Sequence, residues 1–273
     1  MRIRKTAAFA LGIVLLSASF LTHAGYTSTR HPIVLVHGVT GFNTIGGLIN
    51  YFHTIPWNLE RSGARVYSAS VSFVNSSEQR GQQLANYVNS LGHSKVNLMA
   101  HSQGAPTSRV TASLIPHKIA SITSINGVNK GSTVADVVRG VLPPGSYVEG
   151  GAQAIANALG GLVNALSGSS NPQDGVAALE TLTTRGTTDL NDALGWKGVN
   201  RSSCSGTNED VWINGNRIKF FSWTGRVPVS TVYERAMERV ERMEDSAFDC
   251  IWLAEHHFTT YSVCPSVTLM GTH

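Results

Sequence analysis

Residues 95–104 have the sequence Lys-Val-Asn-Leu-Met-Ala-His-Ser-Gln-Gly, which predicts a strand followed by a sharp turn. Its first six residues are mostly apolar and are typical of a strand buried in a parallel sheet. Residues 105–114 follow and are predicted to form a helix. Ser102 therefore lies on the sharp turn between a strand and a helix, with the small residues Ala100 and Gly104 two positions away on either side.

A serine on such a turn is a candidate nucleophile. The strained backbone lifts its hydroxyl clear of the sheet and places it at the N-terminus of the following helix. The usual pattern has glycine where this chain has Ala100, which adds one methyl group and remains compatible with close packing. We therefore predict that Ser102 is the catalytic nucleophile.

The elements around this turn alternate between strand and helix. Residues 33–36, Ile-Val-Leu-Val, predict a strand buried on both faces, and Ser76 with Gln79 predicts a capping box for a helix that ends near Leu91. The other predicted elements are a helical stretch at residues 49–61 and strands at residues 65–73 and 119–125. This alternation predicts an α/β fold with a mostly parallel, doubly wound sheet.

A glycine-containing loop, His37-Gly38-Val39-Thr40-Gly41-Phe42, follows the first apolar strand. Acyl transfer develops negative charge on a carbonyl oxygen, and two backbone N–H groups must already point at that oxygen. We predict that Gln103, the residue after the nucleophile, supplies one N–H group and that Val39 supplies the other. The glycines on either side of Val39 would let the backbone approach closely.

The first 24 residues are predicted to be a signal peptide. Arg2, Arg4 and Lys5 precede an uncharged apolar run from about Ala7 to Leu21, and small residues end the segment at Ala24. Because the run is too short to span a membrane, we expect cleavage after Ala24 and secretion to the outside of the cell by way of the periplasm. An uncleaved anchor is the alternative.

The charge is nearly balanced without this segment. Three of the 21 Lys and Arg residues lie in it, which leaves 18 against 17 Asp and Glu. The pI of about 9.1 therefore comes mostly from the signal peptide and gives no support to nucleic-acid binding. The remaining chain of about 249 residues is long enough for one α/β domain.

Residues 143–170 differ in composition from the rest of the chain, because they are rich in Gly, Ala, Ser and Asn and almost without charge. They contain an apolar stripe at helical spacing, formed by Ile155, Leu159, Leu162, Val163 and Leu166. An ordinary core-facing helix has such a stripe. The alternative hypothesis is a mobile lid whose apolar face covers the active site and turns toward lipid when the lid opens.

The motifs together resemble those of the secreted bacterial triacylglycerol lipases of the Pseudomonas and Burkholderia type. The resemblance is carried by residues 32–38, residues 95–104, Asn129-Lys130-Gly131-Ser132 with Asp136, and residues 219–225. It implies an α/β-hydrolase domain at residues 25–225 that hydrolyses ester bonds of water-insoluble acylglycerols at an oil–water interface. It also implies a helical lid at about residues 143–170 and a dedicated export foldase as a partner.

The resemblance ends at Gly225. These lipases continue with chain that holds the catalytic Asp and His, a calcium site and a disulfide cysteine, and none of those motifs is recognisable here. Residues 233–273 instead resemble the first βα unit of a luciferase-like flavin monooxygenase. This second resemblance implies that residues 226–273 are an atypical, chimeric C-terminal segment. One βα unit cannot form the barrel that binds flavin, so no cofactor is predicted.

The predicted nucleophile needs a histidine that is oriented by a carboxylate. The chain order nucleophile, acid, histidine admits Asp249 followed by His257, and His256 and His273 are the alternatives for the histidine. The other interpretation is that these tail residues have no catalytic role. His101, next to the serine, is expected to form a wall of the acyl site.

Three cysteines, Cys204, Cys250 and Cys264, permit one disulfide in an oxidising compartment, and the sequence does not determine the pair. The resemblance implies that Cys204 pairs with a cysteine near the catalytic histidine, a place that the other two could take only if the tail folds back there. No cysteine spacing resembles a zinc site, and the calcium ligands of the lipases have no counterpart, so no metal is predicted.

Three functions are compatible with these observations. The leading hypothesis is an active extracellular lipase or esterase that works through a serine acyl-enzyme. The second is a catalytically impaired lipase-fold protein that keeps the nucleophile and the oxyanion hole but lacks a proper Asp and His pair. The third, favoured only by the tail, is a flavin-dependent oxidoreductase.

Overall fold

The computed structural model describes residues 25–45, 49–141, 168–202 and 209–224, together with single positions between 150 and 165. The strands are β1 Ile33–Val36, β2 Thr44–Ile45, β3 Ile49–Asn50, β4 Val66–Ser68, β5 Val96–His101, β6 Ile119–Ile125, β7 Asp210–Ile213 and β8 Asn216–Trp223. The helices are α2 Ile55–Glu60, α3 Ser77–Ser90, α4 Gly104–Leu114, α5 Thr133–Val141, α7 Gly175–Leu182 and α8 Thr184–Ala193, with a 3-10 turn η1 at Pro116–Lys118.

The described strands form a six-stranded sheet in the order β4-β1-β5-β6-β8-β7 and a separate antiparallel pair, β2 and β3. Neighbours in the large sheet are parallel except β7, which runs antiparallel to β8. Val36 pairs with Ala100 and Ala100 with Ser124, so β1, β5 and β6 end at one edge of the sheet. The predicted α/β class with a mostly parallel sheet is confirmed.

Strand β1 is buried on both faces, as its continuous apolar sequence predicted. Its residues Ile33–Val36 are all at most 5% exposed. Val34 belongs to the main core cluster, which includes Leu84 of α3, whereas Leu35 belongs to a second cluster against which Leu59 of α2 packs. The two clusters lie on opposite sides of the strand because successive side chains alternate between the faces of a sheet.

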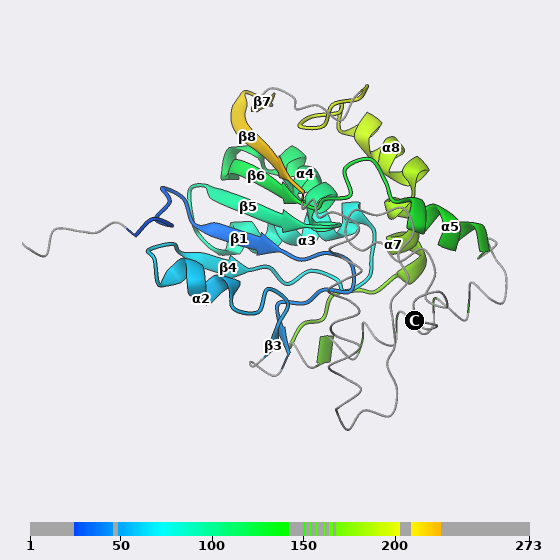
Figure 1. The fold of residues 1–273 in the computed structure, drawn as a ribbon, viewed down its shortest axis with the longest axis horizontal. Helices are drawn as coiled ribbons and strands as arrows, with labels where there is room; N and C mark the ends of the chain where they lie inside the picture. The colour runs from blue at the N-terminus through cyan, green and yellow to red at the C-terminus, as the bar shows by residue number, and fades with distance from the viewer. Residues whose placement is uncertain are drawn as a thin grey trace, which may run out of the picture.

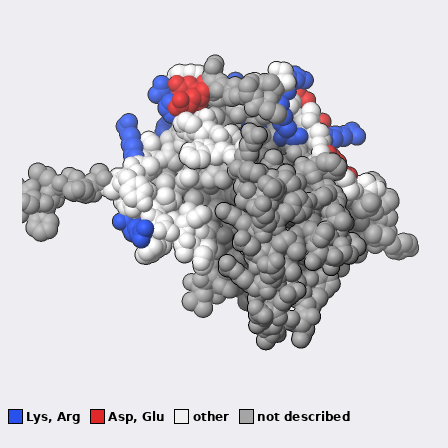
Figure 2. Space-filling model, viewed as in Figure 1, with Lys and Arg blue, Asp and Glu red and all other residues white. Residues whose placement is uncertain are grey.

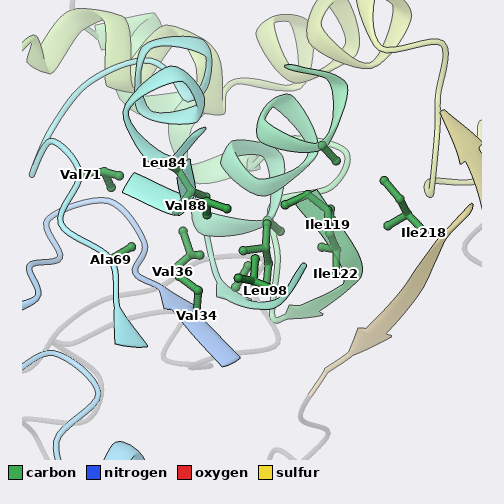
Figure 3. Packing of buried hydrophobic residues seen from close by; sticks show 14 residues of the cluster. Val34, Val36, Ala69, Val71, Leu84, Val88, Leu98, Ile119, Ile122 and Ile218 are labelled. Carbon is green, nitrogen blue, oxygen red and sulfur yellow. The ribbon is translucent and has the colours of Figure 1, made fainter. Parts of the chain in front are cut away.

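Helices α3 and α4 cover one face of the sheet, and α5, α7 and α8 lie beyond the carboxyl ends of the strands (Figure 1). Figure 3 shows Leu84 and Val88 of α3 directed at the strand residues Val36 and Leu98. These four side chains are fully buried. Burial of each contributes about 1.5–3 kcal/mol relative to exposure.

Helix α3 begins at the predicted cap. The hydroxyl of Ser76 accepts a hydrogen bond from the N–H of Gln79 at 3.2 Å, and Gly92, with a φ of +71°, follows the end of the helix. The reciprocal half of the predicted capping box is absent, because the N–H of Ser76 donates instead to the side-chain oxygen of Asn75 at 2.8 Å. The Asn75 side chain therefore takes the acceptor role that was expected of Gln79.

Two predicted elements are shorter in the structure. The helical stretch expected at residues 49–61 begins only at Ile55, because Pro56 lacks an N–H group and fits the first turn of a helix. The strand expected at residues 65–73 ends at Ser68. Its pairing with β1 ends there, and farther along the N–H of Ser72 donates at 2.8 Å to the Gln83 side chain of α3.

Candidate active site

Ser102 lies between the last residue of β5 and the first residue of α4. Its φ is +55°, in the left-handed region that residues other than glycine rarely adopt. Its N–H donates to the carbonyl oxygen of Ile125 at 3.2 Å, and its carbonyl oxygen accepts from the N–H of Ala105 at 3.1 Å. Hydrogen bonds to β6 and to α4 thus hold this strained turn, whose backbone costs on the order of 1–3 kcal/mol.

Two glycines allow the close approach of backbone around Ser102. A Cβ added to Gly104 would lie 2.4 Å from the carbonyl oxygen of Val36, and one added to Gly38 would lie 2.8 Å from the Cβ of Ser102. Both distances are too short for any side chain, so only glycine fits without a shift of the backbone. The loop after β1 therefore lies directly against the serine turn.

The N–H groups of Val39 and Gln103 are the two predicted oxyanion donors. Within the part of the chain that the structure describes, neither group donates a hydrogen bond to a protein acceptor. Gln103 is the N-cap of α4, and the first N–H groups of a helix have no partner within the helix. The described residues thus provide no acceptor for either N–H group.

A fully buried cluster of polar side chains lies under this loop and consists of His37, Arg80 and Gln103. The Arg80 guanidinium donates to the carbonyl oxygens of His37 and Gly38 and to the side-chain oxygen of Gln103 at 2.6, 3.0 and 2.8 Å. Burial, and then the Arg80 charge, lower the pKa of His37 to about 3. Burial lowers the pKa of Arg80 to about 9. At neutral pH the histidine is therefore neutral and the arginine is charged.

A cleft of about 790 Å³ opens at the carboxyl ends of the parallel strands. This edge of an α/β sheet is where loops from several strands converge, and ligands bind there in open α/β folds. The lining includes residues from the loops after β1, β5, β6 and β8, among them Val39, Ser102, Asn126, Ser132, Trp223 and Thr224. Ser102 thus faces a cavity that can hold a small organic substrate.

His101 lines the same cleft, as predicted, but its ring contacts Tyr51 and not the serine. The Nδ1 atom of His101 lies 2.6 Å from the hydroxyl oxygen of Tyr51, and burial lowers the pKa of His101. Among the residues that the structure describes, no histidine forms a hydrogen bond with the Ser102 hydroxyl. The described residues therefore identify no histidine partner of Ser102.

The predicted partners of Ser102 lie outside the described residues, and so do the three cysteines and the apolar stripe of the predicted lid. The residues concerned are Asp249, His257, the alternatives His256 and His273, Cys204, Cys250 and Cys264. Described positions in the lid segment form hydrogen bonds with the chain that follows it. Gln153 donates to Asp174 at 3.5 Å, and Asn157 accepts from the N–H of Gly175 at 3.0 Å. The lid and the catalytic pair stay predictions.

Sequence reasoning missed Arg80 and Tyr51. A signal for Arg80 was present, because Leu84 and Val88 lie four and eight positions later and define the buried stripe of α3, in which Arg80 is the charged member. No local pattern indicated Tyr51, which reaches His101 from a loop fifty positions earlier. Its role depends on tertiary contact alone.

Comparison with known proteins agrees with this geometry. Residues 31–171 match the protein family described as alpha/beta hydrolase fold. A triacylglycerol lipase of Vibrio cholerae is 47% identical over 223 residues, which cover 80% of this chain and 70% of that lipase. The chain belongs to the bacterial triacylglycerol lipases of the α/β-hydrolase fold.

Two other members of the family are also similar to the chain described here. The triacylglycerol lipases of Pseudomonas fragi and Burkholderia plantarii are 37% and 36% identical to it, over 76% of this chain and 70% and 61% of their own lengths. The predicted resemblance to such lipases is confirmed, and with it the class of carboxylic ester hydrolases.

Two further findings concern only the described residues of this lipase. No helix among them is both long enough and apolar enough to cross a membrane. Nor do three or more of their His, Cys, Asp and Glu side chains gather where they could hold a metal ion.

Proposed function

We propose that this lipase hydrolyses the ester bonds of acylglycerols at an oil–water interface and that Ser102 is its nucleophile. The observation that carries the proposal is the left-handed backbone of Ser102 at the end of β5, held against Gly38 and facing a cleft of about 790 Å³. The substrate class rests on the relatives, which are named triacylglycerol lipases. The turn is a nucleophile elbow in this proposal.

The reaction proceeds through an acyl-enzyme. The Oγ of Ser102 attacks the ester carbonyl carbon while its proton passes to a histidine, and the carbonyl oxygen becomes an oxyanion. The carbon–oxygen bond to the alcohol then breaks, and the histidine returns the proton to the departing alcohol. Water repeats the sequence on the acyl-serine, which releases the fatty acid and restores the serine.

The oxyanion is stabilised by the N–H groups of Val39 and Gln103. Support comes from their shared position beside Ser102 and from the lack of a protein acceptor for either group in the described part of the chain. Donors that are already in place need no reorganisation when charge develops. Removing one such donor typically costs about 10²–10³ in rate.

The acid and base are proposed to be Asp249 and His257, with His256 and His273 as alternatives for the base. Two observations support this choice: the rings of His37 and His101 bond groups other than Ser102, and the tail provides the required chain order. A catalytically impaired lipase is the outcome if the tail does not supply this pair.

Secretion through the periplasm, after removal of residues 1–24, is part of the same proposal, as are a lid at residues 143–170 and help from an export foldase. Among the residues that Figure 2 colours, the charged side chains lie in small groups at the margins of this face, and uncharged residues adjoin them on one side. A surface poor in charge suits a protein that works against lipid rather than on a polyanion.

Hydrolysis of short and long p-nitrophenyl esters and of emulsified triacylglycerol tests the proposal. Wild type should be active, and the rate of ester hydrolysis by Ser102→Ala should be lower by several orders of magnitude. Ser113→Ala is the matched control, because the Ser113 hydroxyl donates to a carbonyl oxygen within α4. Equal low rates for wild type and Ser102→Ala would contradict the enzyme function. An activity confined to the soluble short ester would mean that the protein is an esterase and not a lipase.

A further inference from the structure

Arg80 occupies an unusual place for a charged side chain. It is 0% exposed, and its guanidinium forms hydrogen bonds with the His37 and Gly38 carbonyl oxygens and with the Gln103 side chain. No carboxylate among the described residues forms an ion pair with it. Burial of an arginine without an acidic partner is costly unless hydrogen bonds satisfy it, so the arrangement calls for an explanation beyond stability.

The carbonyl oxygen of Gly38 is the first element of that explanation. It accepts from both terminal nitrogens of Arg80, each at 3.0 Å. This carbonyl belongs to the same peptide unit as the N–H of Val39, and in a trans peptide the two groups point in opposite directions. By holding the oxygen on the buried side, Arg80 turns the Val39 N–H away from itself. A flip of this peptide would turn that N–H inward and remove the donor.

The Gln103 side chain is the second element. Its oxygen accepts from Arg80 at 2.8 Å, and its amide nitrogen donates to the carbonyl oxygen of Asn75 at 2.8 Å. The side-chain amide of Gln103 is therefore held through both its oxygen and its nitrogen. One guanidinium thus joins the loop that carries Val39 to the turn that carries Gln103.

Charge adds to this geometry. The guanidinium polarises the Gly38 carbonyl, which strengthens the N–H of the same peptide as a donor. His37 contacts Arg80 at 3.2 Å, and its depressed pKa keeps it neutral, so it adds no second charge to the buried cluster. The positive charge of Arg80 lies in a medium of low dielectric close to where negative charge develops during acyl transfer.

We propose that Arg80 is a positioning residue that holds the N–H groups of Val39 and Gln103 where both can donate to the oxyanion. The inference rests on the proposed function of Ser102. Arg80 itself does not touch the substrate, because it is fully buried beneath the loop.

The test compares Arg80→Lys with Arg109→Lys. Arg109 is the matched control, because it is also buried, at 4% exposure, and it bonds the carbonyl oxygen of Lys197 and the side chain of Asn191, neither of which belongs to the serine turn or to the loop that carries Val39. A lysine keeps the charge but has one nitrogen, so it cannot span the carbonyl oxygens and the glutamine together. Both variants should lose stability to a similar degree.

Only Arg80→Lys should change catalysis. We expect its kcat on a p-nitrophenyl ester to fall about 10–100-fold, with KM changed less than about threefold, because the lost interaction acts mainly in the transition state. Affinity for an alkyl boronic acid, which forms a tetrahedral adduct with the serine, should fall in parallel with kcat. Arg109→Lys should keep both values within about threefold of wild type.

The outcomes separate this inference from the proposed function. Wild type that neither hydrolyses the ester nor binds the boronic acid overturns the function of Ser102. Active wild type, together with a folded Arg80→Lys that behaves like Arg109→Lys, overturns the role of Arg80. If Arg80→Lys does not fold, Gln103→Met removes the side-chain acceptor and keeps the backbone N–H. That variant should show the same selective loss of kcat, and an unchanged kcat would again overturn the inference.

Discussion

Gly38 lies so close to Ser102 that a Cβ on the glycine would be 2.8 Å from the serine Cβ and 3.2 Å from its hydroxyl oxygen. The two residues come from the loops after β1 and β5, sixty-four positions apart in the chain. The absent side chain leaves the space in which the serine hydroxyl and the neighbouring N–H groups can meet a substrate. This contact is what makes the loop after β1 part of the serine site.

Gly38→Ala should therefore lower activity more than stability. The added methyl group must displace the Ser102 side chain or the loop, and we expect kcat to fall at least about tenfold, since small misplacements of reacting groups are costly. The measurement is ester hydrolysis beside a urea unfolding curve. Gly140→Ala is the control, because none of the described residues lies within 4 Å of a Cβ at that position of α5. Full activity in Gly38→Ala would show that the close contact is not functional.

The tail histidines provide a second prediction. Among the single changes His256→Ala, His257→Ala and His273→Ala, one should lower kcat by several orders of magnitude, because a serine without its base is a poor nucleophile. We expect His257→Ala to be that variant, and Asp249→Asn should show a large loss as well. Steady-state ester hydrolysis measures the effect. A uniform, small response across the histidines would mean that the tail does not hold the base.

The lowered pKa of the buried His37 predicts that the stability of the protein depends on pH. Its pKa is about 3 in the folded protein against 6.5 in the unfolded chain, so the unfolded chain binds more protons as pH falls below 6.5. The contribution of this group is present above pH 6.5 and is lost progressively toward pH 3. Between pH 6.5 and 5 the loss should be roughly 2 kcal/mol. Urea unfolding at several pH values measures it.

The comparison variant for this effect is His37→Gln, which should have a shallower dependence of unfolding free energy on pH over the same interval. His117→Gln, a change at an exposed position, leaves His37 in place and should keep the slope of wild type. The assignment fails if wild type and His37→Gln lose stability in parallel between pH 6.5 and 5.

The core under the site gives a fourth prediction. Leu84 is fully buried in the cluster between α3 and the sheet, so Leu84→Ala should cost about 2–5 kcal/mol in free energy of unfolding. Leu114→Ala, at a position that is 46% exposed, should cost less than about 1 kcal/mol. Denaturant titration of both variants decides the matter, and equal losses would contradict the packing described for α3.

Much of the fold was predictable from local sequence. The apolar runs of β1 and β5 and the cap at Ser76 predicted their elements closely, because burial on both faces and a polar N-cap are local signals. The early end of β4 was not predictable from its own sequence, since β4 pairs with β1, and that pairing ends where Leu35 lies opposite Ser68. Likewise α5, α7, α8 and the pair β7 and β8 were not predicted.

The residues of the site also fall into two groups, those predicted from local sequence and those that depend on tertiary contacts. Ser102 and the loop with Val39 were found because a strand, a turn and a helix follow one another in the chain. Arg80 was missed because a charged residue within a helix is expected on the solvent side, and only the tertiary structure places it under the loop. Asp249 and His257 were inferred from chain order alone, and they lie outside the described residues.

The claim that Ser102 is an activated nucleophile is tested most directly by covalent labelling. A fluorophosphonate reacts with activated serines without any assumption about the ester substrate, and peptide mass spectrometry locates the adduct. We predict one phosphonyl group on Ser102 in wild type and none in Ser102→Ala, with Ser113→Ala labelled as wild type is. No adduct on Ser102 in folded wild-type protein, or an adduct on another serine, would contradict the account.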